Sequence, residues 1–176
     1  MKLLIIKFIS IFIYLIPTNP SYAIQQPDFK NILLYKEPKK VENIAFKNLD
    51  NEKVNLKDYK NSLIILNFWA TWCKPCIDEM PSLNRLQINN KFKNLKVIPI
   101  NVGQESKIKS INFFKKLNID NLEIFFDDSL NLPKKFSLRG LPTSILINKN
   151  GQIFARIVGS IDFDDQKFIK WLNQFD

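Results

Sequence analysis

A run of mostly apolar residues at 63–69 leads, after three further residues, into a Cys-x-x-Cys motif formed by Cys73 and Cys76. An apolar run of this length is typical of a strand that is buried on both faces inside a partly parallel sheet. Beyond the motif, apolar residues recur at near-helical spacing, at Ile77, Met80, Leu83 and Leu86. The sequence therefore predicts that both cysteines lie where a central strand turns into a helix.

The segments on either side of this unit predict an α/β domain. Short apolar runs and helical patterns alternate further along the chain, as a strand at 97–102, a helix at 108–117, a strand at 123–126 and a short helix at 129–136. Before the unit, apolar stretches between residues 41 and 56 flank Asp50 and Asn51, which indicates an N-terminal β-hairpin. We expect a central mixed β-sheet flanked by helices.

The C-terminal part predicts a second hairpin and a closing helix. Apolar stretches lie on both sides of Asn150 and Gly151, whose residue types tolerate the positive φ angles of a tight turn. Asp162 or Asp164 is the expected N-cap of the closing helix. The apolar face of this helix carries Phe168, Leu172 and Phe175.

The N-terminus has the pattern of an export signal. Lys2 and Lys7 precede an apolar stretch, and Ser21-Tyr22-Ala23 forms a small-residue cleavage pattern. The stretch after Lys7 is shorter than the ~20 residues that span a bilayer, so we favour a cleaved signal peptide at 1–23 over a retained membrane anchor. Residues 24–40 are then an N-terminal extension and 41–176 the folded domain. The expected location is the periplasm or another extracytoplasmic compartment.

Composition excludes several kinds of chemistry. The chain has no histidine, which removes His-based general bases, Ser-His-Asp triads and His-ligated metals. Two cysteines cannot form a four-ligand zinc site, so we expect neither a metal nor a cofactor. The net charge is +9, but the lysines are scattered without a basic block. We interpret them as solvated surface and expect no nucleic-acid partner.

The two cysteines have the arrangement of a redox pair. A thiolate attacks disulfides, and the N-terminus of a helix favours the thiolate form. Cys73 at the predicted helix start is therefore the expected attacking thiol, and Cys76, one turn inward, the resolving one. The alternative is a structural disulfide, but closing so short a loop stabilises the fold by only about 2 kcal/mol. In an exported chain with no other cysteine we favour the redox function.

A resemblance to a known family rests on two separated motifs. Residues 68–76, with Glu79-Met80-Pro81 after them, and the later residues 140–144 resemble the TlpA/ResA-like thiol-disulfide oxidoreductases of the thioredoxin superfamily. The resemblance covers about residues 41–176. It implies a thioredoxin-like fold and an enzyme that exchanges thiols and disulfides.

The resemblance also implies roles for particular residues. It implies a cis bond between Leu141 and Pro142 beside the disulfide, where the backbone before Pro142 pairs with a substrate strand; sequence alone favours a trans proline. Trp72 either shapes the docking surface or packs in the core. Glu79 either exchanges a proton with Cys76 or is an ordinary exposed helix residue paired with a lysine.

The expected activity is reduction of disulfides in specific extracytoplasmic proteins. By resemblance, electrons come from a membrane thiol-disulfide transporter and pass to disulfide-containing protein substrates, such as those of cytochrome c or cytochrome oxidase maturation. Contact with the membrane itself is expected only if the N-terminal segment is retained. The alternatives are an oxidase or isomerase of exported proteins, which a reduction potential distinguishes, and a non-catalytic interaction module with an inert disulfide, which thiol reactivity distinguishes.

Overall fold

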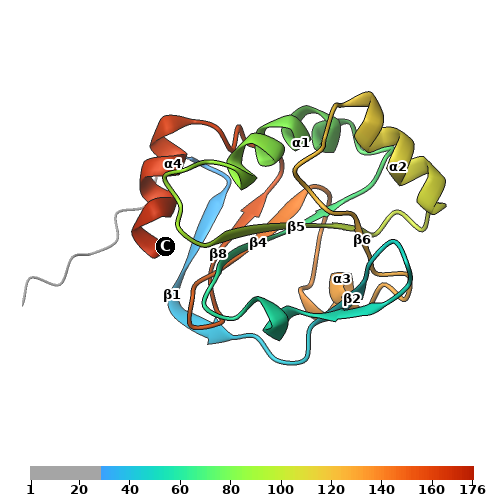
Figure 1. Cartoon of the computed structure of the whole chain (residues 1–176). Coiled ribbons are helices and arrows are strands. Elements are labelled where there is room, and N and C mark those ends of the chain that lie inside the picture. Colours follow the sequence, from blue (N-terminus) through green and yellow to red (C-terminus); the bar gives the residue numbers. More distant parts are fainter. Residues whose placement is uncertain (1–28) are drawn as a thin grey trace, which may run out of the picture.

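The computed structural model describes residues 29–176, which form one mixed sheet with helices on both faces (Figure 1). The strand order is β1-β8-β7-β4-β5-β6-β2-β3. The strands are β1 (Ile32–Lys40), β2 (Ala45–Lys47), β3 (Lys53–Asn55), β4 (Leu63–Trp69), β5 (Leu95–Asn101), β6 (Phe125–Phe126), β7 (Thr143–Ile147) and β8 (Gln152–Val158). The helices are η1 (Leu56–Tyr59), α1 (Lys74–Gln87), α2 (Lys107–Lys116), α3 (Asn131–Lys135), α4 (Gln166–Leu172) and η2 (Asn173–Phe175).

The predicted central strand is β4. All of its residues are buried, and it pairs parallel with β5 and antiparallel with β7. The expected hairpins form between β2 and β3 and between β7 and β8. The predicted fold class is therefore confirmed.

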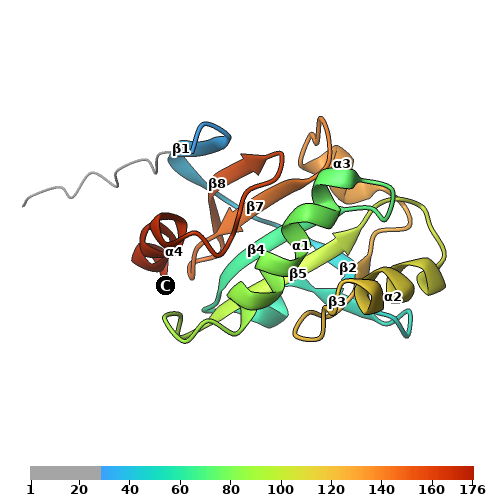
Figure 2. The same cartoon turned by 90° about the horizontal axis from the view of Figure 1, so that it is seen from above.

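Two apolar clusters fill the two sides of the sheet. Helices α1, α2 and α4 cover one face, and Figure 2 shows α1 lying over β4 and β5 with α2 and α4 on its two sides. Side chains alternate along a strand, so Ile65 and Trp69 of β4 join the cluster under these helices, while Leu66 and Phe68 join the opposite cluster. The same alternation directs Asn67 toward α1.

Some details differ from the expectations. Residues 32–40, expected in an extension before the domain, form β1 and pair with β8 at one edge of the sheet. The sequence did not indicate this because β1 is mostly exposed and lacks a regular apolar pattern. The N-cap of α4 is Asp165, which accepts hydrogen bonds from the backbone of Lys167 and Phe168. The expected cap Asp162 instead accepts from the backbone of Asp164.

The predicted signal peptide, residues 1–23, lies outside the described residues. Within residues 29–176 no helix has both the length and the apolar character needed to cross a bilayer.

Candidate active site

The two cysteines form a disulfide at the start of α1, as the sequence predicts. Their Cα atoms lie 5.3 Å apart, and Cys73 is the N-cap of the helix. The Cys73 sulfur accepts a hydrogen bond from the Cys76 backbone N–H at 3.3 Å, so this sulfur already faces the free donors of the helix end. Cys73 is 5% exposed and Cys76 is fully buried. Only Cys73 is open to an incoming partner.

Glu79 lies one helical turn beyond Cys76 and is 2% exposed. Its Oε1 accepts a hydrogen bond from Asn67 Nδ2 at 2.7 Å, and the same amide nitrogen donates to Ser144 Oγ at 3.0 Å. Burial raises the pKa of Glu79 to about 8, although the Asn67 amide and the Ile161 backbone favour the charged form. The alternative of an exposed glutamate paired with a lysine is therefore wrong. How near the carboxyl lies to the sulfurs stays a prediction.

This buried network comes from three elements. Asn67 lies on β4, Glu79 on α1 and Ser144 on β7, so the helix is joined to two neighbouring strands. Sequence analysis missed Asn67 and Ser144. The signal for Asn67 was present, because it is a single polar residue inside an apolar strand, on the same side as Trp69.

A second polar contact holds the loop between β4 and Cys73. The Glu105 carboxylate accepts from the Thr71 backbone N–H at 2.9 Å and from the Thr71 hydroxyl. Gly103 allows this approach, since a Cβ there would overlap the Glu105 carboxylate and come within 2.9 Å of the Ala70 Cβ. Sequence analysis missed Glu105. Its only signal is position, because the segment that follows β5 lies beside the segment that follows the parallel strand β4.

The Leu141–Pro142 bond is cis, as the resemblance implies. Pro142 is buried, and half-buried Leu141 packs against the apolar cluster that contains both cysteines. The Pro142 carbonyl accepts from Gly159 at 2.9 Å. Within residues 29–176, no hydrogen bond reaches the backbone of Leu141, which leaves its polar groups free for another chain. Direct contact between Pro142 and the disulfide stays a prediction.

Trp72 is 68% exposed beside the buried disulfide. The core-packing alternative is therefore wrong. A large exposed aromatic side chain next to a reactive group is typical of a recognition surface.

Comparisons with known proteins agree with this geometry. The family model described as the AhpC/TSA family matches residues 38–156. The chain belongs to this family. It is also 36% identical over 121 residues to the thiol-disulfide oxidoreductase ResA of Bacillus cereus (strain ZK / E33L), covering 69% of each chain. ResA of Bacillus subtilis (strain 168) is 30% identical over 119 residues, which are 68% of this chain and 65% of that one.

Solved structures place this AhpC/TSA family member among thioredoxin-like proteins. A DsbF homologue from Corynebacterium diphtheriae has a TM-score of 0.71 at 25% identity, over 85% of this chain and 96% of that one. A thiol:disulfide interchange protein of the thioredoxin family from Chlorobium tepidum has a TM-score of 0.64 at 25% identity, over 77% and 97%. The predicted TlpA/ResA-like resemblance is confirmed, and the protein is a thiol-disulfide oxidoreductase that acts on disulfide-containing proteins.

The arrangement supplies what disulfide exchange needs. A sulfur at a helix start can carry negative charge, and a buried carboxyl whose pKa lies near neutrality can give a proton when neutral and take one when charged. In the part of the chain that the structure describes, no cluster of three or more acidic or cysteine side chains could hold a metal ion.

Proposed function

We propose that this protein is an exported reductase of disulfides in particular extracytoplasmic proteins, with Cys73 and Cys76 as its redox pair. The observation that carries the proposal is the unequal exposure of the two cysteines at the start of α1. Cys73 caps the helix and is 5% exposed, while Cys76, one turn further in, is fully buried. An incoming disulfide meets Cys73 first.

The reaction has two exchange steps. The Cys73 thiolate attacks one sulfur of the substrate disulfide, forming a mixed disulfide and releasing the other substrate sulfur as a thiolate. Cys76 then gives up its proton and attacks the Cys73 sulfur, which forms the Cys73–Cys76 disulfide and releases the second substrate thiolate. The substrate gains two electrons and the protein loses two. We propose a membrane thiol-disulfide transporter as the donor that reduces the pair again.

Glu79 is the proposed proton carrier for Cys76. It lies one turn further along the same helix, and burial raises its pKa to about 8, so both its protonation states are accessible near neutral pH. Neutral Glu79 would protonate a departing Cys76 thiolate during reduction of the pair. Charged Glu79 would accept the Cys76 proton during substrate release.

Substrate docking is assigned to Trp72, Leu141 and Pro142. The exposed ring of Trp72 offers apolar contact area, and the free backbone groups of Leu141 can pair with an extended substrate segment. Proteins of cytochrome c or cytochrome oxidase maturation are the proposed substrates, by similarity to the family. Export is proposed through a signal peptide that ends at Ala23, and the mass of the mature protein tests it.

Trapping tests the proposal directly. In the Cys76→Ser variant the mixed disulfide on Cys73 cannot be resolved, so it should accumulate with particular exported proteins that mass spectrometry can identify. The matched control, Cys73→Ser with Cys76→Ser, should trap nothing. Absence of adducts on the single variant would contradict the proposal.

A reduction potential tests the direction of electron flow. We expect a value nearer to the about −270 mV of thioredoxin than to the about −120 mV of the strong oxidant DsbA. A value near the oxidising end would favour an oxidase instead.

A further inference from the structure

A cavity of about 590 Å³ lies at the end of the molecule opposite the disulfide. It is lined by the β1–β2 connection, by η1 and the residues after it up to Ile64, and by the β7–β8 turn. Ser62 and Ile64 lie at the start of β4, whereas Cys73 follows its end. The seven residues of β4 span about 20 Å at about 3.3 Å per residue, so the cavity is separate from the candidate active site.

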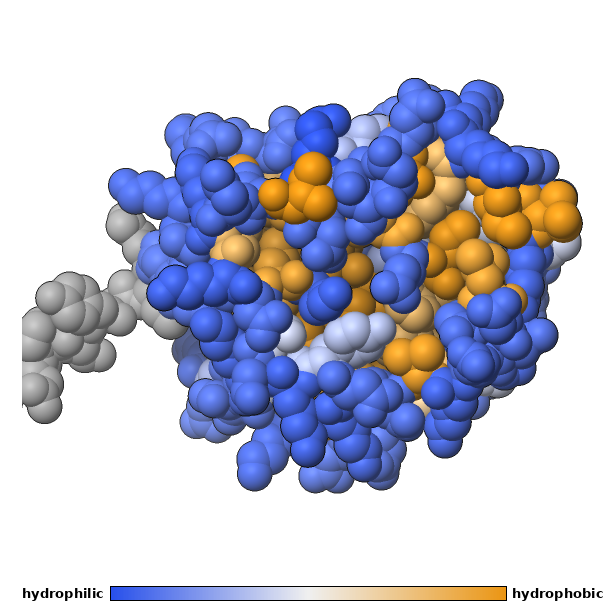
Figure 3. Space-filling view, viewed as in Figure 1, coloured by the Kyte–Doolittle hydropathy of each residue, from blue (hydrophilic) through white to orange (hydrophobic). Residues whose placement is uncertain are grey.

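The floor of the cavity is apolar. Four buried aliphatic side chains line it: Ile44, Leu56, Ile64 and Ile147. Figure 3, in the orientation of Figure 1, shows a face that is hydrophilic around most of its edge, with hydrophobic side chains grouped over its middle and near α2. The volume is in the range of small-molecule sites, which are mostly apolar with a few placed polar groups.

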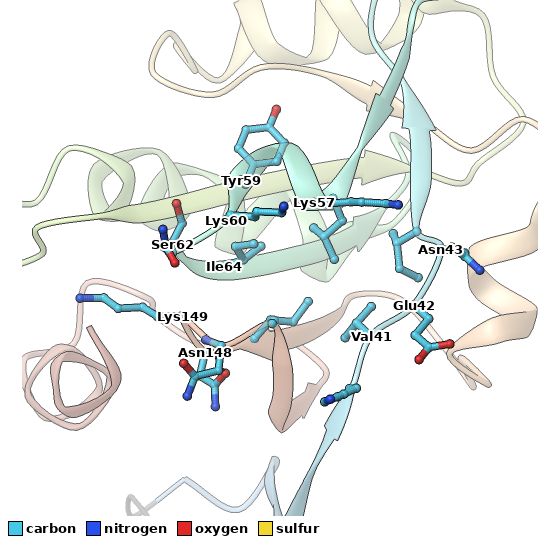
Figure 4. Close-up of a pocket in the computed structure, with 17 residues that line it drawn as sticks. Val41, Glu42, Asn43, Lys57, Tyr59, Lys60, Ser62, Ile64, Asn148 and Lys149 are labelled. Carbon is cyan, nitrogen blue, oxygen red and sulfur yellow. Dashed lines mark hydrogen bonds between the residues drawn. The ribbon is translucent and has the colours of Figure 1, made fainter.

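The rim of the cavity is positively charged. Lys40, Lys57, Lys60 and Lys149 line it, and Glu42 is the acidic residue among the lining side chains. Figure 4 shows Lys57 and Lys60 on one side, Asn148 and Lys149 on the other, and Ile64 between them.

The rim lysines are mostly free of acidic partners. Lys149 pairs with Asp176 at 3.6 Å. Among residues 29–176 no acidic side chain lies within salt-bridge distance of Lys40, Lys57 or Lys60. Unpaired ammonium groups around an apolar floor are complementary to a molecule with an anionic head and an apolar body.

We propose that this cavity binds an amphiphilic monocarboxylate, with its hydrocarbon tail on the aliphatic floor and its carboxylate beside Lys57 and Lys60, which lie on the same side of the cavity. A small inorganic anion would leave the apolar floor unused, because the floor contributes only by burying hydrocarbon surface. A neutral or cationic amphiphile would leave the lysines without a partner. The site does not depend on the disulfide chemistry.

Decanoate below its micelle concentration is the probe, titrated into the oxidised full chain while backbone amide shifts are recorded by NMR. We expect saturable shifts centred on residues 41–44, 57–64 and 147–151. Decanol should bind at least about fivefold more weakly, because its hydroxyl carries no charge to pair with the lysines. A tenfold difference in affinity would correspond to about 1.4 kcal/mol of head-group interaction. Decyltrimethylammonium and inorganic phosphate should give no saturable shifts there.

Matched variants separate the cavity from general surface charge. Lys57→Gln with Lys60→Gln should weaken decanoate binding at least about fivefold. Lys109→Gln with Lys116→Gln removes the same charge from exposed positions on α2 and should leave it unchanged. Val41→Trp fills the cavity from its edge and should abolish binding, while the dispersion of the amide spectrum reports that the chain is folded.

Several results would overturn the proposal. These are the absence of saturation in the wild type, equal weakening in both lysine pairs, equal affinity for decanol, or shifts centred on Trp72 and Leu141. A further experiment measures binding of the protein to vesicles of phosphatidylglycerol. Binding to these vesicles without binding to monomeric decanoate would identify a membrane-docking surface in place of the cavity site.

Discussion

The two ends of β4 differ in how exposed their polar side chains are. At its carboxyl end, Glu79 and Asn67 are buried and hydrogen-bonded to each other, and Glu105 is bonded to the loop that precedes Cys73. At its amino end, lysines such as Lys57 and Lys60 are exposed around an apolar hollow. One end is a buried polar network and the other is an exposed charged rim.

The difference shows where the fold tolerates an energetic cost. Burying a carboxyl disfavours its charged form. Glu79 in the core therefore lowers the stability of the folded state whenever it is charged, and not when it is neutral. Exposed lysines carry almost no such cost. We therefore expect substitutions at the carboxyl end of β4 to have large effects on both chemistry and stability, and substitutions at the amino end to have small ones.

The largest expected effect is loss of the attacking sulfur. Cys73→Ser should lower the rate of disulfide exchange by at least about 10³-fold, because removal of an enzyme's nucleophile typically leaves only residual activity. Reduction of a disulfide-linked model peptide, followed by fluorescence, measures this rate. A variant that kept a tenth of the wild-type rate would contradict the assignment of Cys73.

Glu79→Gln should have the next largest effect. Loss of a proton-transferring group typically lowers a rate by about 10²-fold or more, and the pH dependence of cysteine reactivity should change with it. Asp78→Asn is the matched control, because Asp78 is an exposed neighbour paired with Lys74. Stopped-flow exchange rates from about pH 5 to 9 measure both variants. Wild-type rates for Glu79→Gln across this range would remove Glu79 from the mechanism.

The same carboxyl predicts a pH dependence of stability. Folding raises the pKa of Glu79 from 4.5 to about 8, so the folded state holds this proton more tightly than the unfolded state. Its contribution to stability is therefore full below about pH 4.5 and is lost as the pH rises to about 8. At about 1.4 kcal/mol per pKa unit, the loss is a few kcal/mol. Denaturant titrations at pH 5 and 9 should show this fall in the wild type and not in Glu79→Gln.

The sequence predicts the unit at the carboxyl end of β4, but not the contacts that other segments make around it. The strand-to-helix unit with Cys73 and Cys76 is local, so apolar patterning and helix-end chemistry predict it directly. The contact between Glu105 and Thr71 joins residues that are 34 positions apart, and no local pattern encodes it. The cavity at the amino end is likewise formed by three segments that are distant in sequence.

The cis state of Leu141–Pro142 was anticipated by family resemblance alone, because base rates favour trans. The exposure of Trp72 was undecided for a similar reason. An aromatic residue in an apolar stretch fits a core or a surface equally well until the neighbouring segments are placed. Pairing across the sheet brings β1 into the domain in the same way, since its partner β8 lies far along the chain.

The contact between Glu105 and Thr71 should have an intermediate effect. Glu105→Ala removes an acceptor from two donors, and a lost hydrogen bond to a charged group destabilises a protein by about 1.5–3 kcal/mol. Because Thr71 lies in the loop that leads to Cys73, we also expect exchange through Cys73 to slow by about tenfold, which corresponds to about 1.4 kcal/mol in activation free energy. A double-mutant cycle with Thr71→Val measures the coupling through the hydroxyl. Additive effects of the two substitutions would show that this bond does not couple them.

The smallest expected effect is at the amino end of β4, from Lys57→Gln with Lys60→Gln. Neither lysine is within salt-bridge distance of an acidic side chain among residues 29–176, and both are exposed, so the pair should change the free energy of unfolding by no more than about 0.5 kcal/mol. The rate of disulfide exchange should stay within about twofold of wild type, because the two sites lie about 20 Å apart and exposed charges at that distance are screened at physiological ionic strength. Denaturant titration and the peptide reduction assay measure the two quantities on the same protein. A tenfold fall in exchange rate, with stability unchanged, would mean that the amino end of β4 takes part in substrate recognition, and the functional separation of the two ends would be wrong.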